Sequence, residues 1–149
     1  MLYIASDHAG FELKTELLKF FQEQKIDCED CGAITYNDQD DYPDFIIPCA
    51  EKVAANPGSR GIVIGGSGQG EAIAANKVKG IRAALWYGGS KDIIALSKEH
   101  NNANVLSLGA RFITVEEAKE AVLLWLKTKF TGEERHVRRL EKINRYEGI

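Results

Sequence analysis

Short apolar segments alternate with amphipathic ones along the whole chain, and this alternation restricts the possible folds more than any other feature. Five segments, several of them continuous apolar runs, are typical of buried parallel strands: residues 2–6, 25–30, 61–66, 82–88 and 104–109. Between and after them the periodicity predicts helices at 11–24, 44–56, 70–79, 90–100 and 115–130, followed by a last basic segment. The pattern predicts an α/β fold in which helices cover both faces of a parallel sheet.

The length fits one domain. A chain of 149 residues with 44% hydrophobic residues can bury one core of its own and leaves no room for two full domains. We find no internal repeat, low-complexity segment or linker in it. The sequence therefore predicts a single domain over residues 1–149.

Charge and hydropathy argue against two classes of partner. The formal net charge is -3, which offers no basic surface for nucleic acid, and the longest apolar runs are far shorter than a bilayer span. The N-terminal residues lack the pattern of a secretory signal. We therefore expect a cytoplasmic protein that binds neither nucleic acid nor membrane.

The three cysteines favour reduced thiols over a disulfide framework, because their number is odd and their spacing unremarkable. Cys28 and Cys31 form a CxxC pair, but a zinc site would need two more ligands at motif spacing. A redox pair should also lie at a helix N-terminus, whereas this pair follows a predicted strand. We expect no metal and no redox cofactor.

Ligands of parallel α/β proteins bind beyond the carboxyl ends of the strands, which selects positions before any chemistry is considered. Asp7 and His8 follow the first predicted strand, and residues 66–71 follow the third. Residues 87–89 follow the fourth strand and residues 109–111 the fifth. The polar loop 36–45, after the second strand, could line the same crevice.

The stretch IVIGGSGQGEAIAANK, residues 62–77, resembles a phosphate loop but has an acid in the wrong place. A dinucleotide fingerprint would need glycine where Glu71 stands, and a Walker A loop would need lysine there. One interpretation is that the loop amides stabilise a developing negative charge while Glu71 moves a proton. The alternative is an idle first-turn acid favoured by the helix dipole. Ser67 lacks an activating base in the sequence pattern, so we interpret it as a hydrogen-bonding residue of the wall.

A second group of polar residues lies in the C-terminal third. Arg135 and Arg139 are four residues apart on one face of the last predicted helix, as in a clamp for an anion, although a solvated basic helix explains them as well. His100 and Asn101 precede the fifth strand, at the sheet edge opposite the expected site. They can serve such a site only if the segment folds over or acts on a neighbouring subunit.

Several motifs together resemble the ribose-5-phosphate isomerase B family, which also contains galactose-6-phosphate and allose-6-phosphate isomerases. The motifs are SDHAGFELK, DYPDF, GGSGQGEAIAANKVKGIRAAL, EHNNANVLSLGAR and RHVRR, and they cover most of the chain in the family's order. The resemblance implies a Rossmann-like three-layer α/β/α fold with a five-stranded parallel sheet. It also implies a homodimer or a dimer of dimers, in which the C-terminal helix of one subunit reaches the active site of another.

The resemblance further implies an activity, the interconversion of D-ribose 5-phosphate and D-ribulose 5-phosphate through an enediolate without metal or cofactor. Many members have a catalytic cysteine where this chain has Ser67. Another branch has this serine with a glutamate four residues on, and GGSGQGE matches that branch, which makes Glu71 the expected base. The resemblance assigns the other roles as follows: phosphate binding to His8, Arg135 and Arg139; the sugar site to Asp7 and Tyr42; ring opening to His100, with Asp7 as the alternative group; oxygen binding to Asn101 and Arg111; and the anion hole to the backbone amides of Gly66, Ser67, Gly68, Gln69 and Gly70.

Two other functions stay open on the sequence. An isomerase of a six-carbon aldose 6-phosphate would use the same chemistry with a longer pocket. A non-enzymatic flavodoxin-like module, such as a phosphoacceptor receiver, would need clustered acids after the first strand and a lysine after the fifth. Here the first strand is followed by Asp7 alone, and the fifth ends in LGAR.

Overall fold

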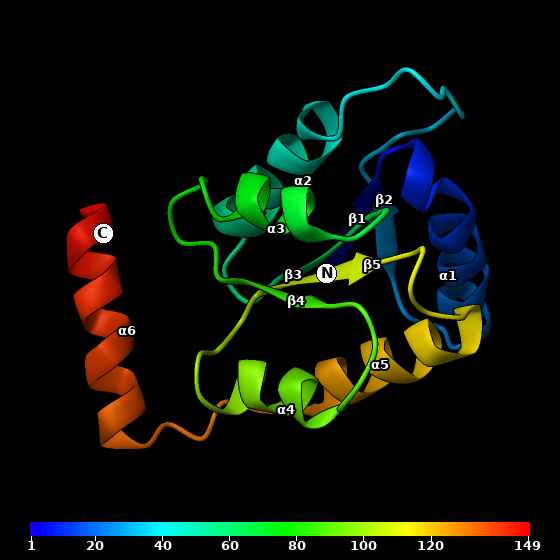
Figure 1. Ribbon diagram of the computed structural model, residues 1–149. Helices are drawn as coiled ribbons and strands as arrows, with labels where there is room; N and C mark the ends of the chain where they lie inside the picture. Colours follow the sequence, from blue (N-terminus) through cyan, green and yellow to red (C-terminus); the bar gives the residue numbers. More distant parts are fainter.

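The computed structural model describes residues 1–149 and contains one five-stranded sheet in which every strand pair is parallel (Figure 1). Its spatial order is β2-β1-β3-β5-β4, so that β5 lies inside the sheet and β4 at its edge. The predicted α/β class and parallel sheet are confirmed. The strands are β1 (Leu2–Ser6), β2 (Cys28–Asp30), β3 (Arg60–Gly65), β4 (Ala83–Trp86) and β5 (Val105–Gly109).

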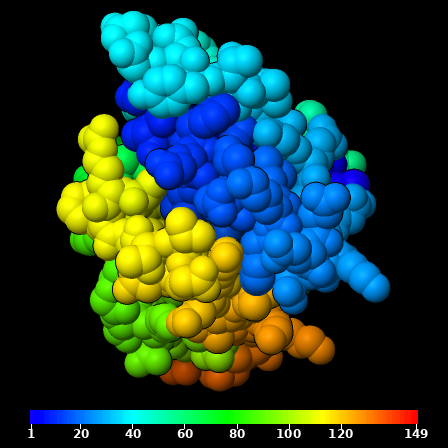
Figure 2. Space-filling view, turned by 90° about the vertical axis from the view of Figure 1, so that its right-hand side faces the viewer, coloured from blue at the N-terminus to red at the C-terminus, as the bar shows by residue number.

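Helices cover both faces of the sheet, as the continuous apolar strands require, because successive side chains of a strand point to opposite faces. The covering helices are α1 (Phe11–Glu23), α2 (Pro43–Ala55), α3 (Gln69–Ala75), α4 (Asp92–Glu99) and α5 (Val115–Lys127). Leu2 and Ile4 of β1 belong to the core beneath α1, α4 and α5, whereas Tyr3 and Ala5 belong to the core beneath α2 and α3. Figure 1 shows these two layers on either side of the strands, and Figure 2 shows the side of the molecule on which α1 lies, in blue. A 3-10 turn (His8–Gly10) precedes α1.

The last helix, α6 (Glu134–Glu147), lies outside the two layers. Figure 1 shows it standing beside the sheet at the end of an extended linker. His136 is its only buried residue. The predicted basic C-terminal helix therefore exists, but most of its surface is free in a single copy of the chain.

Several predicted elements are longer than the observed ones, and in two of them local contacts explain the difference. The segment predicted as a strand from residue 25 first forms a turn after α1, in which Lys25 has a φ of 55° and the Ile26 amide bonds to the Phe21 carbonyl, so β2 begins only at Cys28. The helix predicted to residue 79 ends at Ala75, because the Asn76 side chain turns to pair with both backbone groups of Ala83. None of the helices combines the length and hydropathy needed to cross a bilayer.

Candidate active site

The glycine loop between β3 and α3 lies at the carboxyl edge of the sheet, where the strand pattern predicted a site. Gly68 has a φ of 75°, and a Cβ added there would come within 2.8 Å of the Leu108 backbone. The Ser107 hydroxyl donates a hydrogen bond of 2.6 Å to the Gly68 carbonyl. The loop is therefore held against β5, and only glycine fits this position without strain.

Glu71, in the first turn of α3, folds back over the end of β3. Its side chain lies so close to Gly65 that a Cβ added to that glycine would be 2.0 Å from the Glu71 Oε1 atom. Only 4% of Glu71 is exposed. Burial raises the pKa of Glu71, its own backbone N–H lowers it, and the charge of Asp7 raises it. A carboxylate with a raised pKa is suited to accept a proton near neutral pH.

Tyr42 and Arg111 enclose the loop from two distant parts of the sequence. A Cβ on Gly70 would lie 2.8 Å from the Tyr42 ring, and one on Gly66 would lie 3.1 Å from the Arg111 guanidinium. The Arg111 amide also donates a 3.0 Å hydrogen bond to the Gly66 carbonyl. Ser67 is half-buried, and its hydroxyl accepts a 3.3 Å hydrogen bond from the Gln69 amide.

His8 is anchored by an acid that the sequence analysis did not select. One oxygen of Asp40 accepts hydrogen bonds from the His8 backbone N–H at 3.1 Å and from its ring Nδ1 at 2.6 Å. This bond to Asp40 is the main cause of the raised pKa of His8. Burial lowers the pKa, the charges of Asp7 and Asp40 raise it, and the charge of Arg111 lowers it. The only sequence signal for Asp40 was its place in the polar loop after the second strand.

The first group of predicted residues therefore meets at one edge of the sheet. Asp7 is buried, accepts a 3.1 Å hydrogen bond from the Gly10 amide, and acts electrostatically on both His8 and Glu71. We call this group, which extends from the strand ends to the loop, the carboxyl-edge cluster. Its members are Asp7, His8, Asp40, Tyr42, residues 65–71 and Arg111.

The second group of predicted residues is not brought to that cluster within one chain. His100 ends α4 and precedes β5, so the length of β5, roughly 15 Å, separates it from the carboxyl edge. Its ring stacks on that of His136 in α6, with the centroids 4.3 Å apart. Arg135 and Arg139 are exposed on the same helix, and Arg135 pairs with Glu133 at 2.9 Å. We call His100, Asn101, Arg135, His136 and Arg139 the distal cluster.

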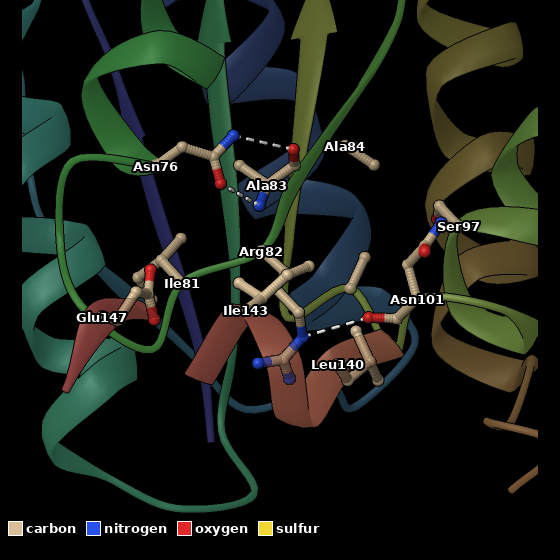
Figure 3. A pocket seen from close by; sticks show the side chains of 11 residues that line it. Asn76, Ile81, Arg82, Ala83, Ala84, Ser97, Asn101, Leu140, Ile143 and Glu147 are labelled. Carbon is tan, nitrogen blue, oxygen red and sulfur yellow. Dashed lines mark hydrogen bonds between the residues drawn. The ribbon is translucent and has the colours of Figure 1, made fainter. Parts of the chain in front are cut away.

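His136, the histidine of the RHVRR motif, was assigned no role from the sequence. It is 4% exposed, and its Nε2 atom is buried without a hydrogen-bond partner. Burial lowers its pKa, and the neighbouring charges of His100 and Arg135 lower it further. The Asn101 carbonyl accepts a 3.0 Å hydrogen bond from Arg82 Nε, which fixes this segment beside α6 (Figure 3). The distal cluster is thus held together by these contacts, but it lies at the end of the strands opposite to Glu71.

Asp7, His8 and Asp40 each have one atom that could bind a metal ion, and these atoms lie within 4.8 Å of one another. Hydrogen bonds inside the chain already explain this arrangement, because one oxygen of Asp7 accepts from Gly10 and one of Asp40 accepts from His8. We therefore interpret the three residues as a hydrogen-bonded support for the His8 ring. No metal centre is assigned to them.

These features define an α/β protein with a buried carboxylate of raised pKa beside a glycine loop and basic side chains. The family model described as Ribose/Galactose Isomerase matches residues 2–143, and the chain belongs to that family. It is 44% identical over 146 residues to ribose-5-phosphate isomerase B of Mycobacterium tuberculosis, covering 98% of this chain and 89% of the relative.

Solved structures agree with the fold over almost the whole chain. Ribose-5-phosphate isomerase B of Mycoplasma genitalium, determined with bound ribulose-5-phosphate, gives a TM-score of 0.93 at 43% identity, covering 99% of this chain and 95% of that one. The Clostridium thermocellum ribose-5-phosphate isomerase B gives a TM-score of 0.92 at 42% identity, covering 99% and 97%. The predicted Rossmann-like family fold is confirmed.

Proposed function

We propose that this protein is an aldose–ketose isomerase that interconverts D-ribose 5-phosphate and D-ribulose 5-phosphate. The observation that carries the proposal is Glu71, a buried carboxylate with a raised pKa that is held against the glycine loop. Family membership supports the class of reaction, and the relative crystallised with ribulose-5-phosphate supports the choice of a pentose phosphate. We further propose that residues 1–149 act as one domain. The three free cysteines suit the reducing cytoplasm, which we propose as the location.

In the proposed mechanism the sugar ring opens first, when His100 or Asp7 moves the proton of the ring hydroxyl. Glu71 then takes the proton from C2, and the electron pair of that C–H bond forms the enediolate. The negative charge on O1 is stabilised by the N–H groups of residues 66–70 and by Asn101, with Arg111 beside the loop. The proton of the C2 hydroxyl passes to O1, and Glu71 returns its proton to C1, so that C2 becomes the carbonyl of the ketose. Atoms and electrons balance within the substrate, so the scheme uses no external oxidant or reductant.

Phosphate binding is assigned to His8 together with Arg135 and Arg139, and the sugar contacts to Asp7 and Tyr42. Two arginines four residues apart on a helix can hold a phosphate through several charge-assisted hydrogen bonds. His8 leaves its Nε2 free for the same purpose, because the described bond to Asp40 uses Nδ1. These assignments require the carboxyl-edge and distal clusters to meet, which one chain does not achieve.

We therefore propose a homodimer, alone or as a dimer of dimers, in which the distal cluster of one subunit completes the carboxyl-edge cluster of the other. β4 is one of the two edge strands of the sheet, and it lies on the side where α6 stands. A two-fold axis beside β4 would bring the carboxyl ends of the strands of one subunit next to the amino ends of the strands of its partner. A cavity of about 500 Å³ lies between β4 and α6 (Figure 3). Ile73 is 61% exposed and Ile143 is 47% exposed, which supplies apolar surface for such a contact.

The function is tested by a coupled isomerisation assay that compares ribose 5-phosphate with allose 6-phosphate on the purified protein. We expect turnover of ribose 5-phosphate with a higher kcat/KM than that of allose 6-phosphate. The reverse preference would assign the same chemistry to a six-carbon substrate. Absence of turnover with both would reject the proposed function and favour a binding module on the same fold.

In the Asp40→Asn variant, the loss of phosphate binding that accompanies rising pH should set in at a lower pH than in the wild type. His8 binds phosphate best as an imidazolium, and its raised pKa keeps the ring protonated at a higher pH than is usual for histidine. The imidazolium is lost as pH rises through the folded-state pKa. Without the Asp40 charge the pKa of His8 should fall. The rise of KM for ribose 5-phosphate with pH should therefore begin at lower pH in the variant, while kcat changes little.

The matched control for this prediction is Asp41→Asn, which removes the same charge from the exposed neighbour of Asp40. Its KM profile should follow that of the wild type. NMR titration of the His8 ring nitrogens gives a readout that is independent of turnover. If Asp40→Asn leaves the His8 titration curve in place, the support assigned to Asp40 is wrong.

A further inference from the structure

A second basic cavity lies at the edge of the sheet opposite the glycine loop. Arg60 begins β3, Arg82 immediately precedes β4, and Asn104 immediately precedes β5, so all three lie at the amino ends of the strands. The cavity has a volume of about 360 Å³. Its polar lining residues are Ser59, Arg60, Arg82, Lys98, Asn102 and Asn104, and no aspartate or glutamate is among the lining residues.

Lys98 is the unusual member of this cavity, because lysine is rarely buried without a carboxylate partner. It is 5% exposed, and its described contacts are a 2.8 Å hydrogen bond to the Ala103 carbonyl and the face of the Trp125 ring, 5.1 Å from Nζ. Burial, and then the charges of Arg60 and Arg82, lower the pKa of Lys98 to about 8. A buried ammonium beside two guanidiniums, with no counter-charge in the cavity, is in an environment that an anion would stabilise.

The two arginines are held in place by backbone carbonyls, which orient their guanidiniums without neutralising them. Arg60 Nη1 donates to the Leu126 carbonyl at 2.6 Å, and Arg82 donates through Nε and Nη2 to the carbonyls of Asn101 and Asn102. Each guanidinium carries five N–H donors, so both keep donors that these bonds do not use. Glu147 of α6 acts on Arg82, but its carboxylate accepts a hydrogen bond from the Gly80 amide and does not line the cavity.

We propose that this cavity, lined by Arg60, Arg82 and Lys98, binds the phosphate dianion of a small metabolite at a site distinct from the carboxyl-edge cluster. Two oriented guanidiniums and an ammonium match the charge and the several oxygens of a phosphate dianion better than they match a single carboxylate. The volume suits a small phosphorylated molecule. The inference does not depend on the proposed isomerase activity.

Calorimetric titration of the full-length protein with inorganic phosphate at pH 7 tests the site. The variants are titrated in the Arg139→Ala background, which removes one arm of the proposed catalytic phosphate clamp, and the wild type is titrated beside them. In that background we expect phosphate still to bind. Lys98→Met should raise the Kd for phosphate at least about tenfold, because a charge-assisted hydrogen bond is lost. Methionine keeps the apolar stem on Trp125. Arg60→Gln should have a similar effect.

The matched control is Arg138→Gln, which removes a charge from an exposed arginine of α6 that pairs with Glu134. It should bind phosphate as the background does, and acetate should bind much more weakly than phosphate to all of these proteins. NMR titration of the Lys98 amine adds a direct readout, since bound phosphate should raise its pKa. The inference is wrong if folded Lys98→Met binds phosphate as tightly as the Arg138→Gln control does, or if phosphate leaves the Lys98 titration unchanged. If Arg139→Ala binds as much phosphate as the wild type does, the role of Arg139 in the catalytic phosphate clamp is rejected, and this result does not bear on the Lys98 site.

Discussion

Glu71→Gln should lower kcat for ribose 5-phosphate by roughly 10²- to 10⁴-fold, the range in which a positioned general base contributes to rate. The amide has nearly the same shape as the carboxylate but cannot accept the C2 proton. It should keep the packing against Gly65, so calorimetric binding of ribulose 5-phosphate should change little. Loss of turnover with retained binding is the expected signature of a proton-transfer residue.

The control for Glu71→Gln is Glu116→Gln, because Glu116 is also a first-turn acid but is exposed at the start of α5. If Glu71 served only to complement the helix dipole, both variants should lose a similar small amount of stability and keep their activity. Gly65→Ala supplies a second arm. Its methyl group would occupy the position of the Glu71 carboxylate and should reduce kcat strongly without removing the acid. Near-normal turnover in Glu71→Gln would remove Glu71 from the mechanism.

A mixture of two inactive variants should regain about a quarter of the wild-type activity, if the site is shared between subunits. Glu71→Gln damages the carboxyl-edge cluster and His100→Ala damages the distal cluster. After co-expression, half of the dimers should contain one chain of each kind, and each such dimer has one intact site and one doubly damaged site. The measurement is the specific activity of the co-expressed protein against that of each variant alone.

His100 stacks on His136, so His100→Ala could disturb folding as well as the site. The same experiment is therefore repeated with Arg139→Ala in place of His100→Ala, because Arg139 is exposed. Activity equal to the average of the two parents in both mixtures would contradict the shared site. As a control, co-expression of Glu71→Gln with Gly65→Ala should restore nothing, since both substitutions damage the same cluster.

The strand ends that form the carboxyl-edge cluster could be predicted because they follow from periodicity and from the parallel sheet alone. Asp7, His8 and residues 66–71 lie directly after predicted strands, and those strands exist. The position of β5 between β3 and β4 could not be predicted in this way, because apolar patterning does not fix the order of strands in space. That order matters, since the Ser107 hydroxyl of β5 holds the glycine loop.

Long-range side-chain pairs were the other limit of the sequence. Asp40 lies 32 residues from His8 in a loop with several acids, and nothing in the pattern distinguishes it from Asp38 or Asp41. The stacking of His100 on His136 likewise depends on where the linker before α6 places that helix. Both contacts join segments whose relative position is set by tertiary packing and not by local propensity.

The glycine loop also restricts how the family can diverge. Glu71 and Tyr42 already occupy the space that a Cβ at Gly65 or Gly70 would need, and a Cβ at Gly66 would press on the Arg111 guanidinium. Substitution at one of these glycines can be accommodated only if its partner shrinks or moves as well. We therefore expect each pair to vary together in evolution, and attempts to change substrate range to succeed through paired substitutions, for example at positions 42 and 70, sooner than through single ones.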